Sequence, residues 1–281
     1  MADDSGGSGS SDGSHGEVAP GEVRVVRHGD GGHVAELVLD RPQALNALST
    51  AFARRLAAAT AALATDPGVR AVVLSSSQLR AFCVGADLKE RNGFTDDDLR
   101  AQRPVLRAAF GGVLNLPMPA IAAVEGFALG GGYEIALSCD LVVAGEGATL
   151  GLPEVSVGLV PGGGGTQLLL RRAGWSRAAD LIFTGRRVDA AEALRLGAVD
   201  RVVAAGTARA AALELASGIA ANSPVGVRHA KRALRLGQSV DLAAGLEIED
   251  AAWRAAAFSP DRAEGIRAFA EKRRPTWPGD T

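Results

Sequence analysis

Cysteine is scarce in this 281-residue chain, which contains only Cys83 and Cys139. Two cysteines provide no disulfide framework and favour a reducing compartment. No apolar run is long enough to span a bilayer, and the N-terminus has neither the apolar core of a signal peptide nor the Arg-rich pattern of a transit peptide. These absences predict a cytoplasmic protein with no membrane partner.

Excess charge and aromatic residues are also lacking. The 30 basic and 32 acidic residues leave a formal net charge of −2, which gives no electrostatic case for a nucleic-acid partner. Aromatic residues make up 4% of the chain and hydrophobic residues 47%, so we expect a core of Ala, Val, Leu and Ile. Lysines are few, and the abundance of Arg, Ala and Gly, which have GC-rich codons, favours a bacterial source.

Two phosphate-binding motifs are missing as well. The chain has no Walker A motif and no G-x-G-x-x-G following a strand, so nucleoside-triphosphate and dinucleotide functions lose support. His28 and His33 flank Asp30-Gly31-Gly32 without a second set of ligands, so no metal site is predicted.

The pattern that is present alternates strands and helices in the first half, whereas helices dominate the second half. This order predicts an α/β fold with a helical C-terminal part. We divide the chain into a disordered Gly/Ser/Asp tail at residues 1–20, a core at 21–205 and a helical region at 206–281. From about Thr166 the expected breaks between helices lie at Gly174, Gly185, Gly197, Pro224, Gly237 and Pro260.

Several elements can be placed individually. Residues 23–26 and 33–39 predict a hairpin, and Ser49 is expected to cap a helix through about residue 64. Thr95 and the acids after it predict a helix to about residue 116, with Pro104 causing a kink or a late start. Short strands are expected at residues 71–74, 141–144 and 149–150.

The most informative stretch is residues 121–140, IAAVEGFALGGGYEIALSCD. An apolar strand at 120–124 is followed by three glycines and then by a helical segment that carries Glu134 in its first turn. Glycines let backbone N–H groups approach a ligand, and a carboxylate is favourable near the helix N-terminus. A tight strand-to-helix turn with a solvated glutamate explains the same residues.

Two further segments could carry chemistry. Residues 81–90, AFCVGADLKE, read as a strand that bends at Gly85 before a helix, and such a loop offers free N–H groups to an oxyanion. Cys83 is better explained as a small buried filler than as a nucleophile. Glu154 lies in an apolar loop before a second glycine run, where a raised pKa suits proton transfer; a capping or salt-bridged glutamate is the alternative, and the favoured one on this segment alone.

Taken together, these segments resemble the crotonase superfamily, and within it the enoyl-CoA hydratases, over residues 23–277. The matching pieces are LDRPQALNALS (39–49), AFCVGADLKE (81–90), IAAVEGFALGGGYEIALSCD (121–140), LGLPEVSVGLVPGGGGTQ (150–167) and FAEKRRPTW (269–277). The resemblance implies a crotonase-type spiral of ββα units with a C-terminal helical region. It also implies a homotrimer or homohexamer that acts on acyl-CoA thioesters, with coenzyme A as part of the substrate and no separate cofactor.

Residue roles follow from the same motifs. The resemblance implies an oxyanion hole formed by the amides of Ala86 and Gly131, water activation by Glu134 and proton delivery to C2 by Glu154. Tyr133, bulky beside the acid, puts the acyl-chain preference in doubt. An isomerase or another crotonase-type lyase is the nearest alternative, and a non-catalytic scaffold is a more distant one. The residues implied in substrate or CoA binding are Ala44, Leu45, Val84, Gly85, Asp87, Leu88, Lys89, Gly130 and Lys272, with Arg273 beside the last.

Overall fold

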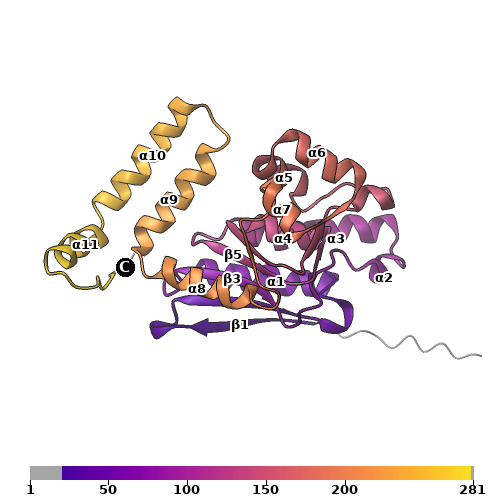
Figure 1. The fold of residues 1–281 in the computed structure, drawn as a ribbon, viewed down its shortest axis with the longest axis horizontal. Coiled ribbons are helices and arrows are strands. Elements are labelled where there is room, and N and C mark those ends of the chain that lie inside the picture. Colours follow the sequence, from indigo (N-terminus) through magenta and orange to yellow (C-terminus); the bar gives the residue numbers. More distant parts are fainter. Residues whose placement is uncertain (1–20, 280–281) are drawn as a thin grey trace, which may run out of the picture.

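The computed structural model describes residues 21–279, so the predicted disordered tail lies outside the described residues. Ten strands form two sheets (Figure 1). The larger sheet has the order β1-β2-β3-β5-β7-β10 and the smaller one the order β4-β6-β8-β9. The strands are β1 (Glu22–His28), β2 (Val34–Asp40), β3 (Ala71–Ser76), β4 (Ala81–Cys83), β5 (Ala120–Val124), β6 (Phe127–Leu129), β7 (Leu141–Gly145), β8 (Thr149–Gly151), β9 (Arg187–Asp189) and β10 (Arg201–Val203).

The predicted spiral of ββα units is present. In three successive turns one strand joins the large sheet, the next joins the small sheet, and a helix follows. The pairs β3/β4, β5/β6 and β7/β8 therefore stack in register, and neighbouring turns pair in parallel. The helices are α1 (Thr50–Ala64), α2 (Leu88–Arg91), α3 (Asp96–Leu114), α4 (Gly131–Ser138), α5 (Gly165–Ala173), α6 (Trp175–Thr184), α7 (Ala190–Leu196), α8 (Ala208–Ala220), α9 (Pro224–Gly237), α10 (Leu242–Ala257) and α11 (Pro260–Ala270), with short 3-10 turns η1 (Asp30–Gly32), η2 (Pro42–Ala44) and η3 (Glu154–Val157).

Local sequence signals placed most boundaries correctly. The hairpin β1–β2 pairs antiparallel, Ser49 Oγ accepts from the Phe52 amide at the start of α1, and Thr95 and Asp98 form a capping box on α3. The expectation of a late start at Pro104 is wrong, because α3 begins at Asp96 and continues through the proline. Strands β9 and β10 have three residues each, too few for periodicity to show, and were missed.

The core lies on both faces of the large sheet. One face packs against α1, α3, α4 and α5 through the main apolar cluster. The other face is covered by α8, which contributes Ala208, Ala212, Ala216 and Ala220 at helical spacing. Helix α8 begins just after the predicted boundary at residue 206 yet packs on the core sheet. The boundary itself stays a prediction.

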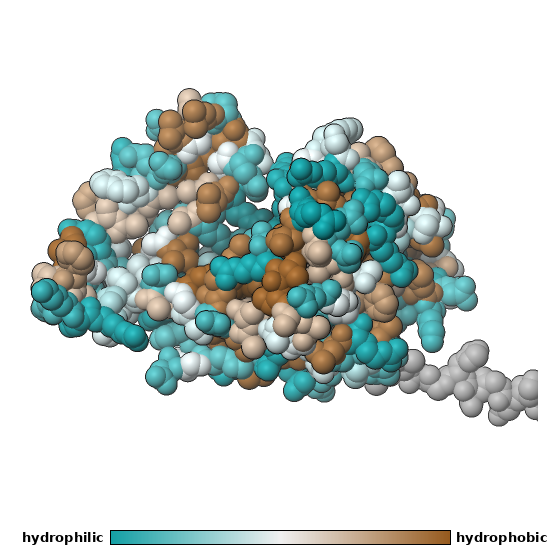
Figure 2. All heavy atoms as spheres, in the orientation of Figure 1, coloured by the Kyte–Doolittle hydropathy of each residue, from teal (hydrophilic) through white to brown (hydrophobic). Residues whose placement is uncertain are grey.

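Helices α9 and α10 form an antiparallel pair that extends away from the sheets (Figure 1). Helix α11 packs beside the start of α9, where Asp261 accepts from the Ser223 hydroxyl and the Val225 amide. No residue of α10 is buried. Large apolar side chains are exposed on this arm, and Figure 2 shows apolar surface at its tip and a hollow between the arm and the body. Among the described residues no helix is long and apolar enough to cross a membrane.

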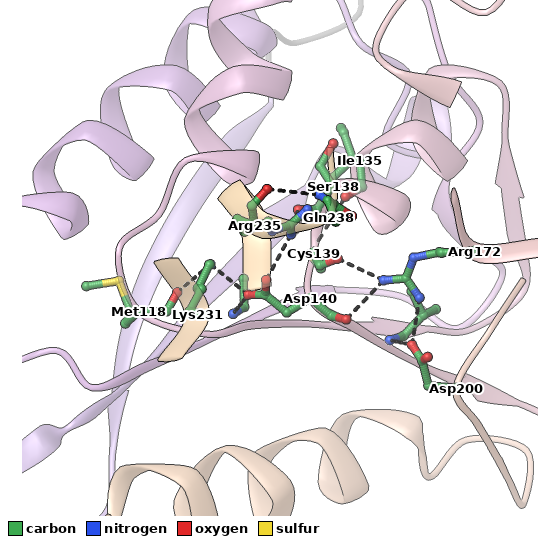
Figure 3. A network of polar contacts seen from close by, with 12 residues as sticks. Met118, Ile135, Ser138, Cys139, Asp140, Arg172, Asp200, Lys231, Arg235 and Gln238 are labelled. Carbon is green, nitrogen blue, oxygen red and sulfur yellow. Dashed lines mark hydrogen bonds and ion pairs between the residues drawn. The ribbon is translucent and has the colours of Figure 1, made fainter. Parts of the chain in front are cut away.

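A buried charge network joins the arm to the core (Figure 3). Asp140, just after α4, pairs with Lys231 Nζ at 2.7 Å and with Arg235 at 2.8 Å, both on α9. The Lys231 ammonium also donates to the Met118 carbonyl at 2.8 Å. Burial lowers the pKa of Lys231, which the charge of Asp140 partly offsets. Its place within an Ala/Leu/Arg-rich helical segment predicts that Lys231 is an ordinary surface residue, and its burial shows that this prediction is wrong.

Candidate active site

A cavity of about 420 Å³ lies where the loops after β4, β6 and β8 meet helix α3. These loops follow the ends of parallel strands in the small sheet, so the topology brings them to one edge. Both predicted acids and both predicted oxyanion donors, Glu134, Glu154, Ala86 and Gly131, line this cavity. The sequence separates them by up to 68 positions, and the spiral unites them.

The loop after β4 presents the Ala86 amide to the cavity. The Leu48 amide donates to the Gly85 carbonyl at 2.7 Å, and the Asp87 amide donates to the Leu48 carbonyl at 3.1 Å. Because both neighbours of Ala86 bond to Leu48, the N–H of Ala86 points to the opposite side of the strand. Gly85 has φ +89°, and a Cβ there would lie 3.0 Å from the Gly131 nitrogen, so only glycine lets the two loops approach.

A buried arginine fixes the loop that supports Ala86. The Arg41 guanidinium donates to Asp87 at 2.7 Å and to the Ala47 carbonyl at 2.8 Å. Asp87 also caps α2, with its Oδ1 accepting from the amides of Lys89 and Glu90. These bonds hold the pKa of Asp87 low even though burial raises it. Asn46, at φ +57°, donates to the Phe82 carbonyl and so ties the same loop to β4.

Glycines also shape the start of α4. Gly131 is the first helical residue, and a first-turn amide has no intrahelical partner. The side of Gly131 is closed by Leu48 and Phe110, whose atoms would be 3.3 Å from an added Cβ. The amides of Ala86 and Gly131 therefore border the same cavity from two loops in contact, as an oxyanion hole requires.

Glu134 is 3% exposed, so the solvated-glutamate alternative is wrong. Its Oε1 accepts from the amides of Gly163 and Gly165, each at 2.7 Å, and so caps the N-terminus of α5. Burial raises its pKa, while the two amides and the charge of Arg103 oppose that rise. No ion pair within residues 21–279 neutralises it.

Glu154 is half-buried at the start of η3, and its Oε2 is buried with no bonding partner among the described residues. Burial raises its pKa to about 7, and the nearby charge of Glu134 contributes to the rise. Its Oε1 would lie 3.0 Å from a Cβ added to Gly130. The salt-bridged alternative is therefore wrong within the described part of the chain.

The predicted binding residues divide into two groups. Four of them line the cavity together with the two acids: Val84, Gly85, Leu88 and Gly130. The remaining positions lie outside the lining: Ala44, Leu45, Asp87, Lys89 and Lys272. Asp87 is occupied by Arg41 and α2, as described above.

Lys272 and Arg273 lie beyond α11, at the opposite end of the molecule from α2 and Lys89 (Figure 1). One chain therefore does not bring Lys89 and Lys272 to a common site. The Arg273 guanidinium is also engaged by Glu264 and Glu271. Its assignment to a CoA phosphate loses support for that reason.

Three bulky or reactive side chains are buried in the core instead. Tyr133 is fully buried and donates its hydroxyl to the Ala198 carbonyl at 2.8 Å, so it cannot shape the acyl pocket as expected. Cys83 and Cys139 are buried, and burial raises the pKa of each thiol to about 12. The interpretation of Cys83 as a small filler is consistent with this burial.

Sequence reasoning missed one whole wall of the cavity. Leu99, Arg103, Leu106 and Phe110 line it from α3, and Arg91 does so from the end of α2. Their i, i+4, i+7, i+11 spacing could have marked one helix face. An arginine within that otherwise apolar stripe was the available signal.

Comparison with known proteins shows the family to which the chain is similar. The sequence model described as enoyl-CoA hydratase/isomerase matches residues 29–280. A mouse mitochondrial enoyl-CoA hydratase domain-containing protein is 41% identical over 271 residues, 95% of this chain and 92% of its own length. The human mitochondrial methylglutaconyl-CoA hydratase is 40% identical over 88% of this chain and 74% of its own. The crystal structure of an enoyl-CoA hydratase from Bacillus anthracis has a TM-score of 0.89 at 40% identity and covers 92% of this chain and 100% of that one.

Proposed function

Because the chain belongs to the enoyl-CoA hydratase/isomerase family, we propose that it adds water across the 2,3 double bond of a 2-enoyl-CoA thioester to give a 3-hydroxyacyl-CoA. One observation carries this proposal. Two carboxylic acids, Glu134 and Glu154, lie in a single cavity without a cationic partner within 21–279, beside the amides of Ala86 and Gly131.

The amides would bind the thioester oxygen. When water adds to C3, the π electrons move toward the carbonyl and negative charge develops on its oxygen. One aimed donor is typically worth about 3 kcal/mol to such a charge. Backbone amides such as those of Ala86 and Gly131 do not titrate, and the Gly131 amide adds the positive end of the α4 dipole.

The two acids would divide the proton transfers. Glu134, whose carboxylate form is favoured by the amides of Gly163 and Gly165, takes a proton from water as oxygen bonds to C3. Glu154, with a pKa raised to about 7, is protonated in part at neutral pH and delivers a proton to C2. The excess proton then leaves Glu134 and Glu154 regains one from solvent, so the cycle is balanced.

Crotonyl-CoA provides the direct test of this reaction. We expect the absorbance of its conjugated thioester to fall as 3-hydroxybutyryl-CoA forms. Conversion of a 3-enoyl-CoA without uptake of water would instead indicate the isomerase, which uses the same cavity. Tight binding of acyl-CoA with no turnover of either substrate would indicate a scaffold.

We also propose a homotrimer or a dimer of trimers, built through the arm. No residue of α10 is buried, and Leu242, Trp253, Phe258 and Phe269 are all more than 60% exposed. Exposed apolar surface of this kind marks an interaction site. Light scattering should give three or six chains, and truncation after Leu236 should dissociate them; a monomer with full activity would contradict the proposal.

A further inference from the structure

Arg103 is a charged residue in the otherwise apolar α3 wall of the active-site cavity. It is the one charged member of the α3 stripe that lines the cavity, between Leu99 and Leu106. Its guanidinium reaches the glycine loop opposite: a Cβ added to Gly162 would lie 2.9 Å from Nη1. Within residues 21–279 no carboxylate forms an ion pair with it.

A second cation lines the same cavity. Arg91 uses its Nε to donate to Gln102 Oε1 at 3.0 Å, and its terminal nitrogens have no bonding partner among the described residues. Burial lowers the pKa of Arg91, the charge of Glu90 raises it, and the positive charge of Arg103 lowers it. The Glu90 carboxylate is bonded by the Thr50 amide and by Gln102 and forms no ion pair with either arginine among the described residues, so the two guanidinium groups in the cavity wall can bind an anion.

The position of Arg103 along the acyl path is defined by Glu134. The Gly163 amide donates to Glu134 Oε1, and Gly162, against which Arg103 lies, is the next residue outward. Phe110, one α3 residue deeper in the stripe than Leu106, closes the side of Gly131. The order from the oxyanion hole outward is therefore Phe110, Leu106 and Arg103, with Arg103 just beyond the acid that would act at C3.

We propose that this cavity selects enoyl-CoA thioesters whose acyl chain ends in a carboxylate one or two carbons beyond C3, bound by Arg103 with Arg91 as a second cation. The inference rests on the proposed hydratase function and specifies its substrate class. Guanidinium binds carboxylate through two parallel hydrogen bonds. Arg103 is exposed in the cavity wall, and an alkyl chain of equal length makes none of these bonds, so it binds less tightly.

Binding of saturated thioesters tests this without any chemical step. We would measure glutaryl-CoA and pentanoyl-CoA, which have equal chain length, by calorimetry. Wild type should bind glutaryl-CoA about 10- to 100-fold more tightly, the range expected for a charge-assisted hydrogen-bonded pair. Arg103→Met should abolish that preference and Arg103→Lys should restore part of it. Arg100→Met is the matched control, because Arg100 lies on the same helix, pairs with Asp97 at the surface and does not line the cavity.

Turnover separates this inference from the proposed reaction. In Arg103→Met, kcat/KM for glutaconyl-CoA should fall about 10- to 100-fold further than kcat/KM for crotonyl-CoA, because any effect of Arg103 on Glu134 is common to both substrates. Equal affinity of wild type for the two saturated thioesters would overturn the inference even if crotonyl-CoA is hydrated. An equal loss on both chains in Arg103→Met would also overturn it, since the arginine would then act on Glu134 or on CoA. A preference that depends on Arg103 without any turnover would uphold carboxylate recognition and refute the hydratase.

Discussion

Helix α4 has a buried or half-buried acid near each end, and the two are held in opposite ways. Glu134, in the first turn, is bonded by backbone amides, and no cation in residues 21–279 pairs with it. Asp140, two residues beyond the last turn, receives Lys231 and Arg235 (Figure 3). Burial raises the pKa of Glu134, which neutral amides hold in place, whereas Asp140 is bound by two cations.

This difference distinguishes an acid suited to proton transfer, Glu134, from an acid that stabilises the packing of helices and strands, Asp140. A buried acid without a counter-ion costs folding free energy, and such groups concentrate at functional sites. A buried acid with matched cations defines which elements pack together. The two carboxylate oxygens of Asp140 receive three donors, from Ala120 of β5 and from Lys231 and Arg235 of α9. Arg235 also donates to the Ser138 carbonyl at the end of α4. Substitution of Glu134 should therefore reduce activity, whereas substitution of Asp140 should reduce the free energy of unfolding.

The largest effect is expected at the reactive end. Glu134→Gln and Glu154→Gln should each reduce kcat for crotonyl-CoA by about 10² to 10⁴, the usual contribution of a general acid or base. The double variant should lose less than the product of the two, because both acids act on one addition. Near-wild-type turnover in either single variant would disprove the assignment of that residue.

The same variants should keep or gain stability at pH 8. Burial raises the pKa of both acids in the folded state, so the native protein holds protons that the unfolded chain releases. Stability therefore falls as pH rises from the unfolded value of 4.5 through about 7 for Glu154, and a glutamine removes that fall. Thermal unfolding at pH 5 and pH 8 measures it; a variant that loses stability at pH 8 alone would reverse the sign.

A smaller loss of activity is expected from Arg41→Met. The substitution frees Asp87 and the Ala47 carbonyl, so the loop that presents the Ala86 amide loses its support. We expect kcat to fall about 10- to 100-fold, less than or equal to the loss of one oxyanion donor. Arg24→Met, which removes a half-exposed pair with Asp40, is the control and should leave kcat unchanged. Equal kinetics in the two variants would refute the positioning role.

The smallest effect on chemistry is expected at the other end of α4. Asp140→Asn leaves Lys231 buried without its carboxylate and should reduce the free energy of unfolding by about 3 kcal/mol. The kcat per folded enzyme should change less than about 3-fold, because the network does not reach the cavity. Urea unfolding with active-site titration measures both quantities. A fully stable variant that is inactive would show that Asp140 belongs to the catalytic machinery.

Sequence predicted those parts of the structure that local rules determine. The cap of Ser49, the glycine breaks and the strand at 120–124 follow from spacing and turn chemistry, and the structure confirms them. The motifs also led to Glu134 and Glu154, and the cavity contains both. Their convergence required the spiral, which no spacing in the sequence reveals.

The remaining features depend on distant pairs. Lys231 resembled a surface lysine because Asp140 lies 91 positions earlier, and only packing of α9 on the core joins them. Tyr133 was expected to influence the acyl-chain preference, but its side chain points toward the Ala198 carbonyl, to which its hydroxyl donates. Arg103 belongs to no local motif, and its place in the cavity wall becomes evident only from its contact with the loop at Gly162. Such contacts follow from tertiary structure and have no signature within one segment.

The pH dependence of kcat/KM for hydration tests the acid–base pair most directly. Hydration needs Glu134 ionised and Glu154 protonated, so the rate should form a bell whose alkaline limb falls through an apparent pKa of about 7. Dehydration of 3-hydroxybutyryl-CoA needs the same singly protonated pair with the proton on Glu134, and because the overall reaction takes up no proton its kcat/KM should follow the same bell. A hydration rate that stays level from pH 6 to pH 9 would contradict proton delivery by Glu154.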